Sequence, residues 1–218
     1  TIVRTGYRSL SVTTTVAANT LLHFSPTLFA PSNGMAKLYV VSAQGDESTG
    51  QLFRYEVAGP ASSPILGLTL TDPGLDRPCC LAFRETGEML VVNRGFPAPG
   101  NAGSISRFAN PGGSPSPGGT IASPDFSGPH FAAARQGEGF VGQRFGNNVL
   151  RFKFDALGDA VPNGAVAAGL AGGAVRGVAV HPVTGELFVA ECCGINEINR
   201  YVFDSDGNAL PNGTISGG

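Results

Sequence analysis

Hydrophobic residues in this chain occur in short runs rather than in one long segment. One kind of run is rich in β-forming residues and closes on a polar residue. It occurs four times, at 38–42, 89–93, 139–143 and 187–191. Such runs favour short strands. A recurrence at about fifty residues indicates an internal structural repeat.

A second shared run follows each of these strands, and in it an arginine precedes an aromatic residue. It lies at 52–55, 105–108, 150–152 and 198–201. Neighbouring residues of a strand point to opposite faces, so the arginine and the ring are expected on different sides. A third apolar run precedes the first at 28–30, 81–83, 131–133 and 178–180, and a fourth follows the second at 65–70, 119–121, 164–166 and 213–215.

Four short strands linked by Gly, Asp, Asn and Pro turns predict one antiparallel meander per repeat. A single meander cannot bury both of its faces, whereas radial stacking of meanders around an axis can. The sequence therefore predicts an all-β fold, a β-propeller of four-stranded antiparallel blades, with four blades. The blades are expected at about 23–70, 71–122, 123–169 and 170–218.

Composition supports this prediction and excludes some functions. The chain holds 32 Gly and 16 Pro, and only 14% of its residues are charged, which suits short strands and tight turns. The hydrophobic share of 42% is too high for a disordered chain. The net charge of −2 offers no basic field for nucleic acid, and no apolar run is long enough to span a membrane.

The last repeat resembles a known class of blade. The segment Gly177-Val-Ala-Val-His-Pro-Val-Thr-Gly-Glu-Leu-Phe-Val-Ala190, followed by Asn196-Glu-Ile-Asn-Arg-Tyr-Val-Phe-Asp204, resembles NHL-like and gluconolactonase-like propeller blades. The resemblance covers about residues 24 to 218 and is a blade pattern, not a catalytic signature. It implies a propeller fold and leaves the function open.

Residues 1–22 match no blade. Their stretch Ser9 to Val16 is rich in β-branched residues, so we expect an N-terminal arm that closes the last blade or adds a strand to a neighbouring molecule. The chain starts at Thr1, which we interpret as the sign of a removed secretory signal. A secreted, extracellular or periplasmic location is therefore expected.

The four cysteines form two adjacent pairs, Cys79-Cys80 and Cys192-Cys193. Disulfides fit an exported chain best. Two alternatives remain open: a thiolate metal site completed by His130 or Glu191, which would select zinc or copper(I), and free reactive thiols. Covalent haem attachment is excluded because the chain has no C-x-x-C-H motif.

In a propeller, the start of the innermost strand and the end of the second strand lie on one face near the axis. The second strands end on Ser42, Asn93, Gln143 and Glu191, and the innermost strands start at Cys79, His130 and Arg176. The resemblance to gluconolactonase-like propellers implies a divalent cation here, with Glu191 and Asn93 as oxygen ligands. The alternative is that these side chains only solvate a channel mouth, since a single carboxylate suits a hard cation poorly.

The segment Asp204-Ser-Asp-Gly-Asn208 resembles the start of a calcium loop, but the twelfth position is Ile215 rather than Glu. A hairpin turn is the preferred interpretation.

Three functions are consistent with these patterns. We expect a secreted, non-catalytic propeller that binds an extracellular partner or assembles with other copies of itself, even into filaments, because no catalytic set of Ser, His and Asp can be assembled by spacing. The alternatives are a metal-dependent lactonase-like hydrolase with its site at the channel mouth, and a metal-carrying protein that uses the cysteine pairs.

Overall fold

The computed structural model describes most of the chain, in the ranges 23–24, 36–43, 50–58, 63–94, 102–166, 170, 174–192 and 196–216. The chain divides into two compact units, Thr1–Arg77 and Pro78–Gly218, and each unit is described separately below. The predicted arm at 1–22 lies outside the described residues.

The first unit contains one antiparallel sheet with its strands in chain order. It consists of β1 (His23–Phe24), β2 (Ala36–Ala43), β3 (Gly50–Val57) and β4 (Ile65–Thr71). We call it blade 1. The first strand, at His23–Phe24, pairs with β2 through Val41 and Val40. The first-strand run expected at 28–30 lies outside the described residues.

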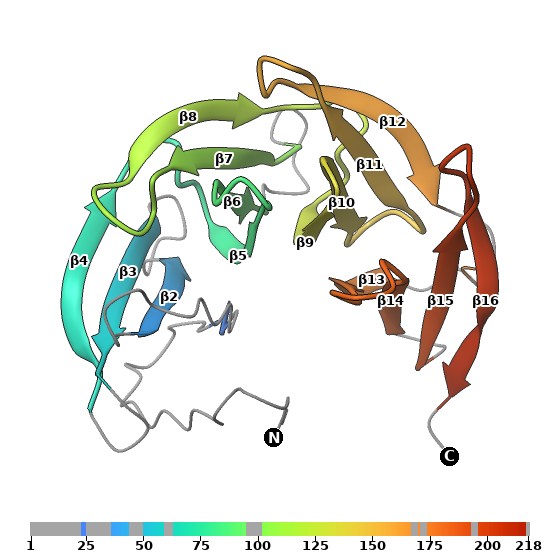
Figure 1. The fold of residues 1–218 in the computed structure, drawn as a ribbon, viewed down its shortest axis with the longest axis horizontal. Helices are drawn as coiled ribbons and strands as arrows, with labels where there is room; N and C mark the ends of the chain where they lie inside the picture. Colours follow the sequence, from blue (N-terminus) through green and yellow to red (C-terminus); the bar gives the residue numbers. More distant parts are fainter. Residues whose placement is uncertain are drawn as a thin grey trace. The chain divides into compact units, whose positions relative to one another are not determined.

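The second unit contains three more sheets of the same kind, again with strands in chain order (Figure 1). Blade 2 consists of β5 (Pro78–Phe83), β6 (Met89–Asn93), β7 (Ser104–Ala109) and β8 (Ser116–Ile121). Blade 3 consists of β9 (Pro129–Arg135), β10 (Glu138–Gln143), β11 (Val149–Phe154) and β12 (Ala160–Val166). Blade 4 consists of β13 (Ala174–Val180), β14 (Leu187–Cys192), β15 (Glu197–Phe203) and β16 (Ala209–Ser216).

The observed strands confirm the predicted fold class. The described residues form four antiparallel four-stranded sheets and no helix, and hence no helix able to span a membrane. Every predicted run from 38–42 onward overlaps a strand, and every strand-to-strand pairing is antiparallel between consecutive strands. The exact division into blades at the predicted boundaries stays a prediction.

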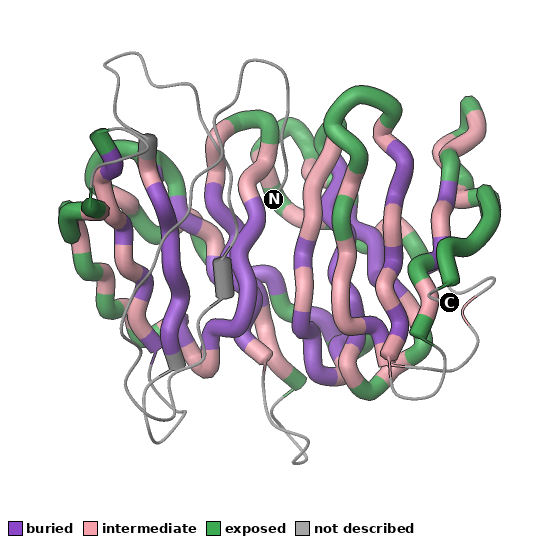
Figure 2. Tube along the Cα trace, turned by 90° about the horizontal axis from the view of Figure 1, so that it is seen from below, coloured by how far each residue is buried: buried purple, intermediate pink, exposed green. Residues whose placement is uncertain are grey.

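Within the second unit the core lies between neighbouring blades. The innermost strands β5, β9 and β13 lie side by side (Figure 1). One apolar cluster joins blades 2 and 3, for example Leu90 and Ile105 with Val141 and Phe152. Another joins blades 3 and 4, for example Phe140 and Val149 with Val189 and Tyr201. Blade 3 thus buries its two faces against blades 2 and 4, as propeller packing requires. Figure 2 shows that the turns carry many of the exposed positions.

Candidate functional site

The start of each innermost strand in the second unit carries the same irregularity. The pairing register of β5 with β6, of β9 with β10 and of β13 with β14 shifts by one residue near its start. Each shift leaves one residue of the innermost strand without a partner position: Cys79 in β5, His130 in β9 and Arg176 in β13. A β-bulge bends the strand and redirects the extra side chain. The three positions predicted to be equivalent are therefore equivalent in structure.

The ends of the second strands are buried rather than solvated. Ser42 in blade 1 and Asn93, Gln143 and Glu191 in the second unit all have buried side chains. The Asn93 amide donates to the hydroxyl oxygens of Ser104 (3.0 Å) and Ser106 (2.8 Å) on the adjacent strand. Hydrogen bonds of this kind are what a buried amide requires.

Gln143 and Glu191 are held in a similar way. Gln143 Oε1 accepts a hydrogen bond from the backbone N–H of Ser127, which lies between blades 2 and 3. Glu191 Oε2 accepts one from Asn199 Nδ2 at 2.7 Å, across β14 and β15. The strand-end side chains of the second unit are therefore tied into the protein by short polar contacts.

Glu191 also affects a buried tyrosine. Burial, assisted by the nearby Glu191 charge, raises the pKa of Tyr201 to about 12. Tyr201 belongs to the apolar cluster between blades 3 and 4. The Tyr201 hydroxyl therefore stays protonated at neutral pH beside the Glu191 carboxylate.

Cys79 and Cys80 are free thiols, in contrast to the disulfide expected for this pair. Both side chains are buried in an apolar cluster with Val92 and Ala132. The Cys79 thiol lies 3.2 Å from the backbone oxygen of His130, whereas the Cys80 sulfur contacts the backbone oxygen of Leu81 at 3.7 Å. Consecutive residues in a strand direct their side chains apart, which keeps the two sulfurs on separate partners.

Burial raises the pKa of the Cys79 thiol, and the neighbouring Cys80 adds to the shift. Burial likewise raises the pKa of Cys80. A thiol, unlike a thiolate, is a poor nucleophile and a poor metal ligand. In the second pair, Cys193 lies outside the described residues, so the predicted disulfide there stays a prediction. Arg176 Nε lies 3.2 Å from Cys192 Sγ.

The predicted metal ligands Glu191, Asn93 and His130 come from three blades. Among the described residues, no three His, Cys, Asp or Glu side chains come together as a group able to hold a metal ion. One oxygen of Glu191 and the amide nitrogen of Asn93 are already hydrogen-bonded within their blades. A set with a single carboxylate fits a hard cation poorly, and the assignment of a divalent metal to these residues stays a prediction.

At the opposite end of the second strands, each blade of the second unit carries an ion pair, which is buried in blade 3 and partly buried in blades 2 and 4. Glu88, Glu138 and Glu186 stand just before or at the start of the second strand, each after a glycine. Arg107 NH2 lies 2.8 Å from Glu88, Arg151 NH2 lies 2.6 Å from Glu138, and Arg200 NH2 lies 2.8 Å from Glu186. We call these the Glu–Arg pairs.

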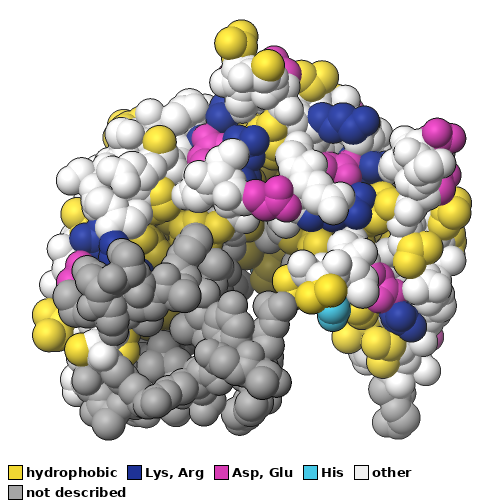
Figure 3. All heavy atoms as spheres, in the orientation of Figure 1, with side chains coloured by type: hydrophobic (Ala, Val, Ile, Leu, Met, Phe, Trp, Pro, Cys, Tyr) yellow, Lys and Arg dark blue, Asp and Glu magenta, His cyan; other side chains and the backbone are white. Residues whose placement is uncertain are grey.

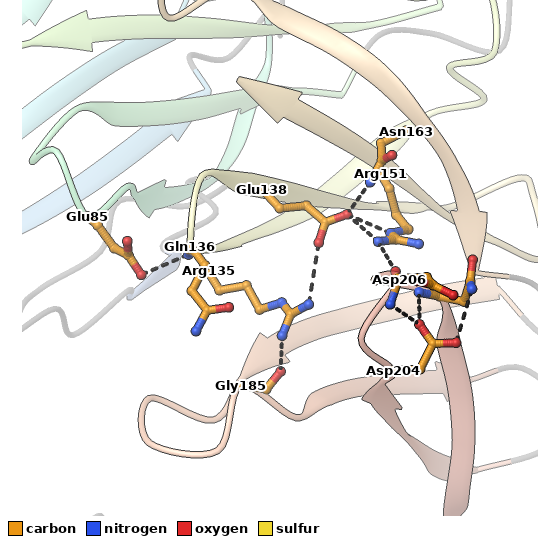
Figure 4. A network of polar contacts seen from close by, with 11 residues as sticks. Glu85, Arg135, Gln136, Glu138, Arg151, Asn163, Gly185, Asp204 and Asp206 are labelled. Atoms are coloured by element: carbon orange, nitrogen blue, oxygen red, sulfur yellow. Dashed lines mark hydrogen bonds and ion pairs between the residues drawn. The ribbon is translucent and has the colours of Figure 1, made fainter. Parts of the chain in front are cut away.

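The fourth strand completes two of these pairs. Asn163 Nδ2 donates to Glu138 Oε1 at 2.7 Å (Figure 4), and Asn212 Nδ2 donates to Glu186 Oε1 at 2.8 Å. In blade 2 the corresponding residue is Gly118, where an added Cβ would lie 3.3 Å from Glu88 Oε1. In blades 3 and 4, a Glu, an Arg and an Asn from three neighbouring strands thus form one hydrogen-bonded set at the end of the sheet. Charge-assisted hydrogen bonds of this kind hold the sheet edge in a fixed geometry.

The arginines also connect one blade to the next. Arg151 NH2 donates to the backbone oxygen of Gly207 in blade 4 at 2.7 Å. Arg135 stacks on the Phe203 ring at 3.6 Å and donates to the backbone oxygen of Gly185 at 3.2 Å (Figure 4). A guanidinium can stack on a ring and donate in its own plane at the same time, which makes arginine suited to such joints.

The turn at Asp204 is a hairpin turn, as preferred from the sequence. Asp204 Oδ1 accepts hydrogen bonds from the backbone N–H groups of Asp206 (3.0 Å) and Asn208 (2.8 Å). Asp155 Oδ1 accepts two equivalent bonds in blade 3, from Leu157 and Asp159. The Asn208 side chain and the turn N–H groups hold the pKa of Asp204 below its usual range. The carboxylates are used by the turns themselves.

The sequence motifs contain both residues of each Glu–Arg pair, but their contact was not predicted from the sequence. The repeated Gly-Glu and Arg-aromatic motifs were visible. In the antiparallel register Phe140 lies opposite Arg151, two residues after Glu138. This diagonal is within reach of a long side chain. On the face drawn in Figure 3, basic and acidic side chains accordingly lie beside one another.

No protein-family model and no curated protein sequence matches the chain. Solved structures do match. A candidate 6-phosphogluconolactonase of Bacteroides uniformis has a TM-score of 0.60 at 15% identity, over 87% of this chain and 56% of that one. The periplasmic gluconolactonase of Pseudomonas aeruginosa has a TM-score of 0.53 at 14% identity, over 92% of this chain and 73% of that one.

A nidogen/laminin complex matches with a TM-score of 0.53 at 18% identity, over 83% of this chain and 62% of the matched one. The chain thus spans less than two thirds of the length of several of these proteins. Identities this low show the fold alone. The predicted blade-level resemblance is confirmed: this chain is a β-propeller protein whose blades resemble those of NHL-like and gluconolactonase-like propellers.

Proposed function

We propose that this chain is a secreted, non-catalytic β-propeller module that binds other copies of itself or an extracellular protein partner. The observation that carries the proposal is the state of the strand ends near the axis. Asn93, Gln143 and Glu191 are buried and each makes a hydrogen bond within the protein, which supports a structural role for them. A net charge of −2 gives no attraction to nucleic acid.

Two further features belong to the proposal. Residues 1–22 would act as an arm that adds a strand to a neighbour. A disulfide at Cys192 would fit an oxidising compartment. A periplasmic gluconolactonase among the similar structures is compatible with export.

The hydrolase alternative follows from the lactonases among the structural neighbours, which share 14–15% identity with this chain. It would place Glu191 on a cation at the channel mouth. The metal-carrier alternative would use the cysteine pairs. It is disfavoured because Cys79 and Cys80 are buried thiols whose pKa values are raised by burial.

The test compares association with hydrolysis on the full chain. Sedimentation over a range of protein concentrations would measure mass, and hydrolysis of a sugar lactone would be followed with added Ca²⁺, Mg²⁺ or Zn²⁺. We expect a mass that rises with concentration and no hydrolysis above the metal-only control. A cation-dependent hydrolysis that disappears in Glu191→Gln would overturn the proposal in favour of the enzyme. A chain lacking residues 1–22 would show whether the arm carries the association.

A further inference from the structure

The fourth strand of each blade in the second unit contains a β-bulge. In blade 3 the pairing of β11 with β12 shifts, so that Asn163 and Gly164 together lie opposite Arg151. In blade 4 the same shift places Asn212 and Gly213 opposite a single residue of β15. Two residues opposite one interrupt the regular ladder at this point. Among the described residues, Asn163 and Asn212 are the asparagines that a glycine follows.

Blade 2 forms the same bulge without an asparagine. There Gly118 and Gly119 lie opposite Arg107, so Gly118 occupies the position of Asn163 and Asn212. The second bulge residue is a glycine with a positive φ in all three blades, a conformation that glycine adopts without strain. The bulge therefore requires its glycine but not its asparagine.

The asparagine amide is used as a donor to the Glu–Arg pair. Asn163 Nδ2 donates to Glu138 Oε1 at 2.7 Å, and Arg151 Nε donates to the same oxygen at 2.7 Å (Figure 4). Asn212 Nδ2 donates to Glu186 Oε1 at 2.8 Å in the same way. Both glutamates are buried. The two amide groups thus satisfy carboxylate oxygens that have lost access to water.

An asparagine followed by a glycine can lose its amide in an intramolecular reaction. The backbone nitrogen of the glycine attacks the asparagine Cγ, a C–N bond forms, and the side-chain nitrogen leaves as ammonia. Water then adds to one of the two carbonyl groups of the resulting succinimide and opens the ring, which gives aspartate or isoaspartate. The reaction consumes only water and is favoured by the closeness of the two reacting groups.

The bulges leave room for this attack. Gly164 and Gly213 have φ angles of 77° and 89°, and no atom lies within 4 Å of the place where a Cβ would stand on either residue. Both glycines are exposed, so water can reach the ring that forms. The attacking nitrogen is therefore hindered neither by a side chain of its own residue nor by a neighbour beside it.

We propose that Asn163 and Asn212 are sites of spontaneous deamidation, by which the amide donor beside a buried glutamate becomes a second carboxylate. The new carboxylate removes a hydrogen bond from the glutamate and places a like charge beside it. In blade 3 it also competes for Arg151, which donates to the backbone oxygen of Gly207 in blade 4. Deamidation thus loosens the end of the blade and its joint with the next one, independently of the proposed binding function.

The first experiment follows the reaction in the full chain. The protein is kept at mildly alkaline pH and digested at intervals, and mass spectrometry measures the conversion of each asparagine. Asn208 is the internal control: it is exposed and its Nδ2 also donates to a carboxylate, that of Asp204 at 3.0 Å, but Ala209 follows it. Conversion at Asn163 and Asn212 should be at least about tenfold faster than at Asn208, because the Ala209 side chain hinders the attacking nitrogen.

The second experiment measures the consequence for folding. Asn163→Asp reproduces the aspartate product, whereas Asn163→Leu removes the donor with nearly the same side-chain shape and adds no charge. We expect Asn163→Asp to lower the equilibrium constant for folding at least about tenfold more than Asn163→Leu does, because two carboxylates then compete for Arg151. Urea unfolding at neutral pH measures both constants. Aged wild-type protein should likewise unfold at a lower urea concentration than fresh protein.

The two experiments can each overturn part of the proposal. Conversion at Asn163 and Asn212 that is no faster than at Asn208 would overturn the modification sites. Conversion that leaves aged protein as stable as fresh protein, with Asn163→Asp no less stable than Asn163→Leu, would overturn the loosening of the blade. The proposed binding function is tested separately, by association and lactone hydrolysis, and its failure would leave these sites standing.

Discussion

Blades 3 and 4 have similar sequences and opposite surroundings. Each has a Glu before the second strand, an Arg on the third and an Asn on the fourth, joined by short hydrogen bonds. In blade 3 the arginine and its apolar neighbours are buried under blade 4. In blade 4 the side chains at the same positions are partly exposed. The repeat motif therefore builds the blade, whereas the blade packed alongside determines how far each of its residues is buried.

The largest difference is expected for the aromatic residues opposite the arginines. Phe140 in blade 3 is fully buried and lies 5.6 Å from the Phe203 ring, whereas its equivalent Phe188 is partly exposed. Phe140→Ala should lower the free energy of unfolding by about 4 kcal/mol. Phe188→Ala should cost about 1 kcal/mol in the monomer. Urea unfolding of both variants measures the difference between the two losses in free energy of unfolding. Equal losses would show that Phe188 is as enclosed in solution as Phe140.

The second largest difference is expected between the ion pairs of blades 3 and 4. Glu138→Ala leaves Arg151 buried without its carboxylate, and breaking such a pair typically costs about 3 kcal/mol. Glu186→Ala should cost about 1 kcal/mol, because the partly exposed Arg200 can turn to water. Denaturant midpoints of the two variants provide the comparison. A larger loss for Glu186→Ala would contradict the view that blade 3 is the more tightly enclosed blade.

Close packing between blades 3 and 4 gives a smaller effect. An added Cβ at Gly142 would lie 2.7 Å from Val175 Cγ1 and 2.9 Å from Val178 Cγ2. Gly142→Ala should therefore destabilise the protein by about 2 kcal/mol through overpacking. Gly177→Ala, within blade 4, is the control, since there the added Cβ meets the Ala190 Cβ at 3.3 Å. Thermal unfolding should show a clear drop for the first variant and little change for the second.

The smallest effect concerns alkaline pH. Burial raises the folded-state pKa of Tyr201 to about 12, above the value of about 10 for an unfolded tyrosine. The folded state therefore holds this proton more tightly, so its contribution to stability is complete below about pH 10 and is lost as the pH rises toward about 12. Tyr201→Phe should make the free energy of unfolding less dependent on pH between about pH 10 and pH 12. Blade 3 has Phe152 at the same position and supplies no such dependence. Denaturant titrations at several pH values check the slope, and an unchanged slope in the variant would refute the assignment.

The candidate site was only partly predictable from the sequence. The equivalence of Cys79, His130 and Arg176 followed from aligning the repeats, and the bulges confirm it. Free thiols at Cys79 and Cys80 were only one of the alternatives left open by the sequence, because an adjacent pair does not reveal that each sulfur packs against a different backbone oxygen. The burial of Gln143 was equally hidden, since its partner Ser127 lies in a connection between two blades.

The sequence by itself determined the repeat, the strands and the alternation of arginine and aromatic ring, because turn chemistry and the two-residue period of a strand are local properties. The tertiary structure alone decided which Glu meets which Arg, which polar strand ends are buried, and how deeply each position of the repeat is buried. These depend on sheet register and on the blade that packs alongside. Ile198 and Val149 stand at the same position of the repeat, yet Val149 is fully buried against blade 4 whereas Ile198 is 36% exposed.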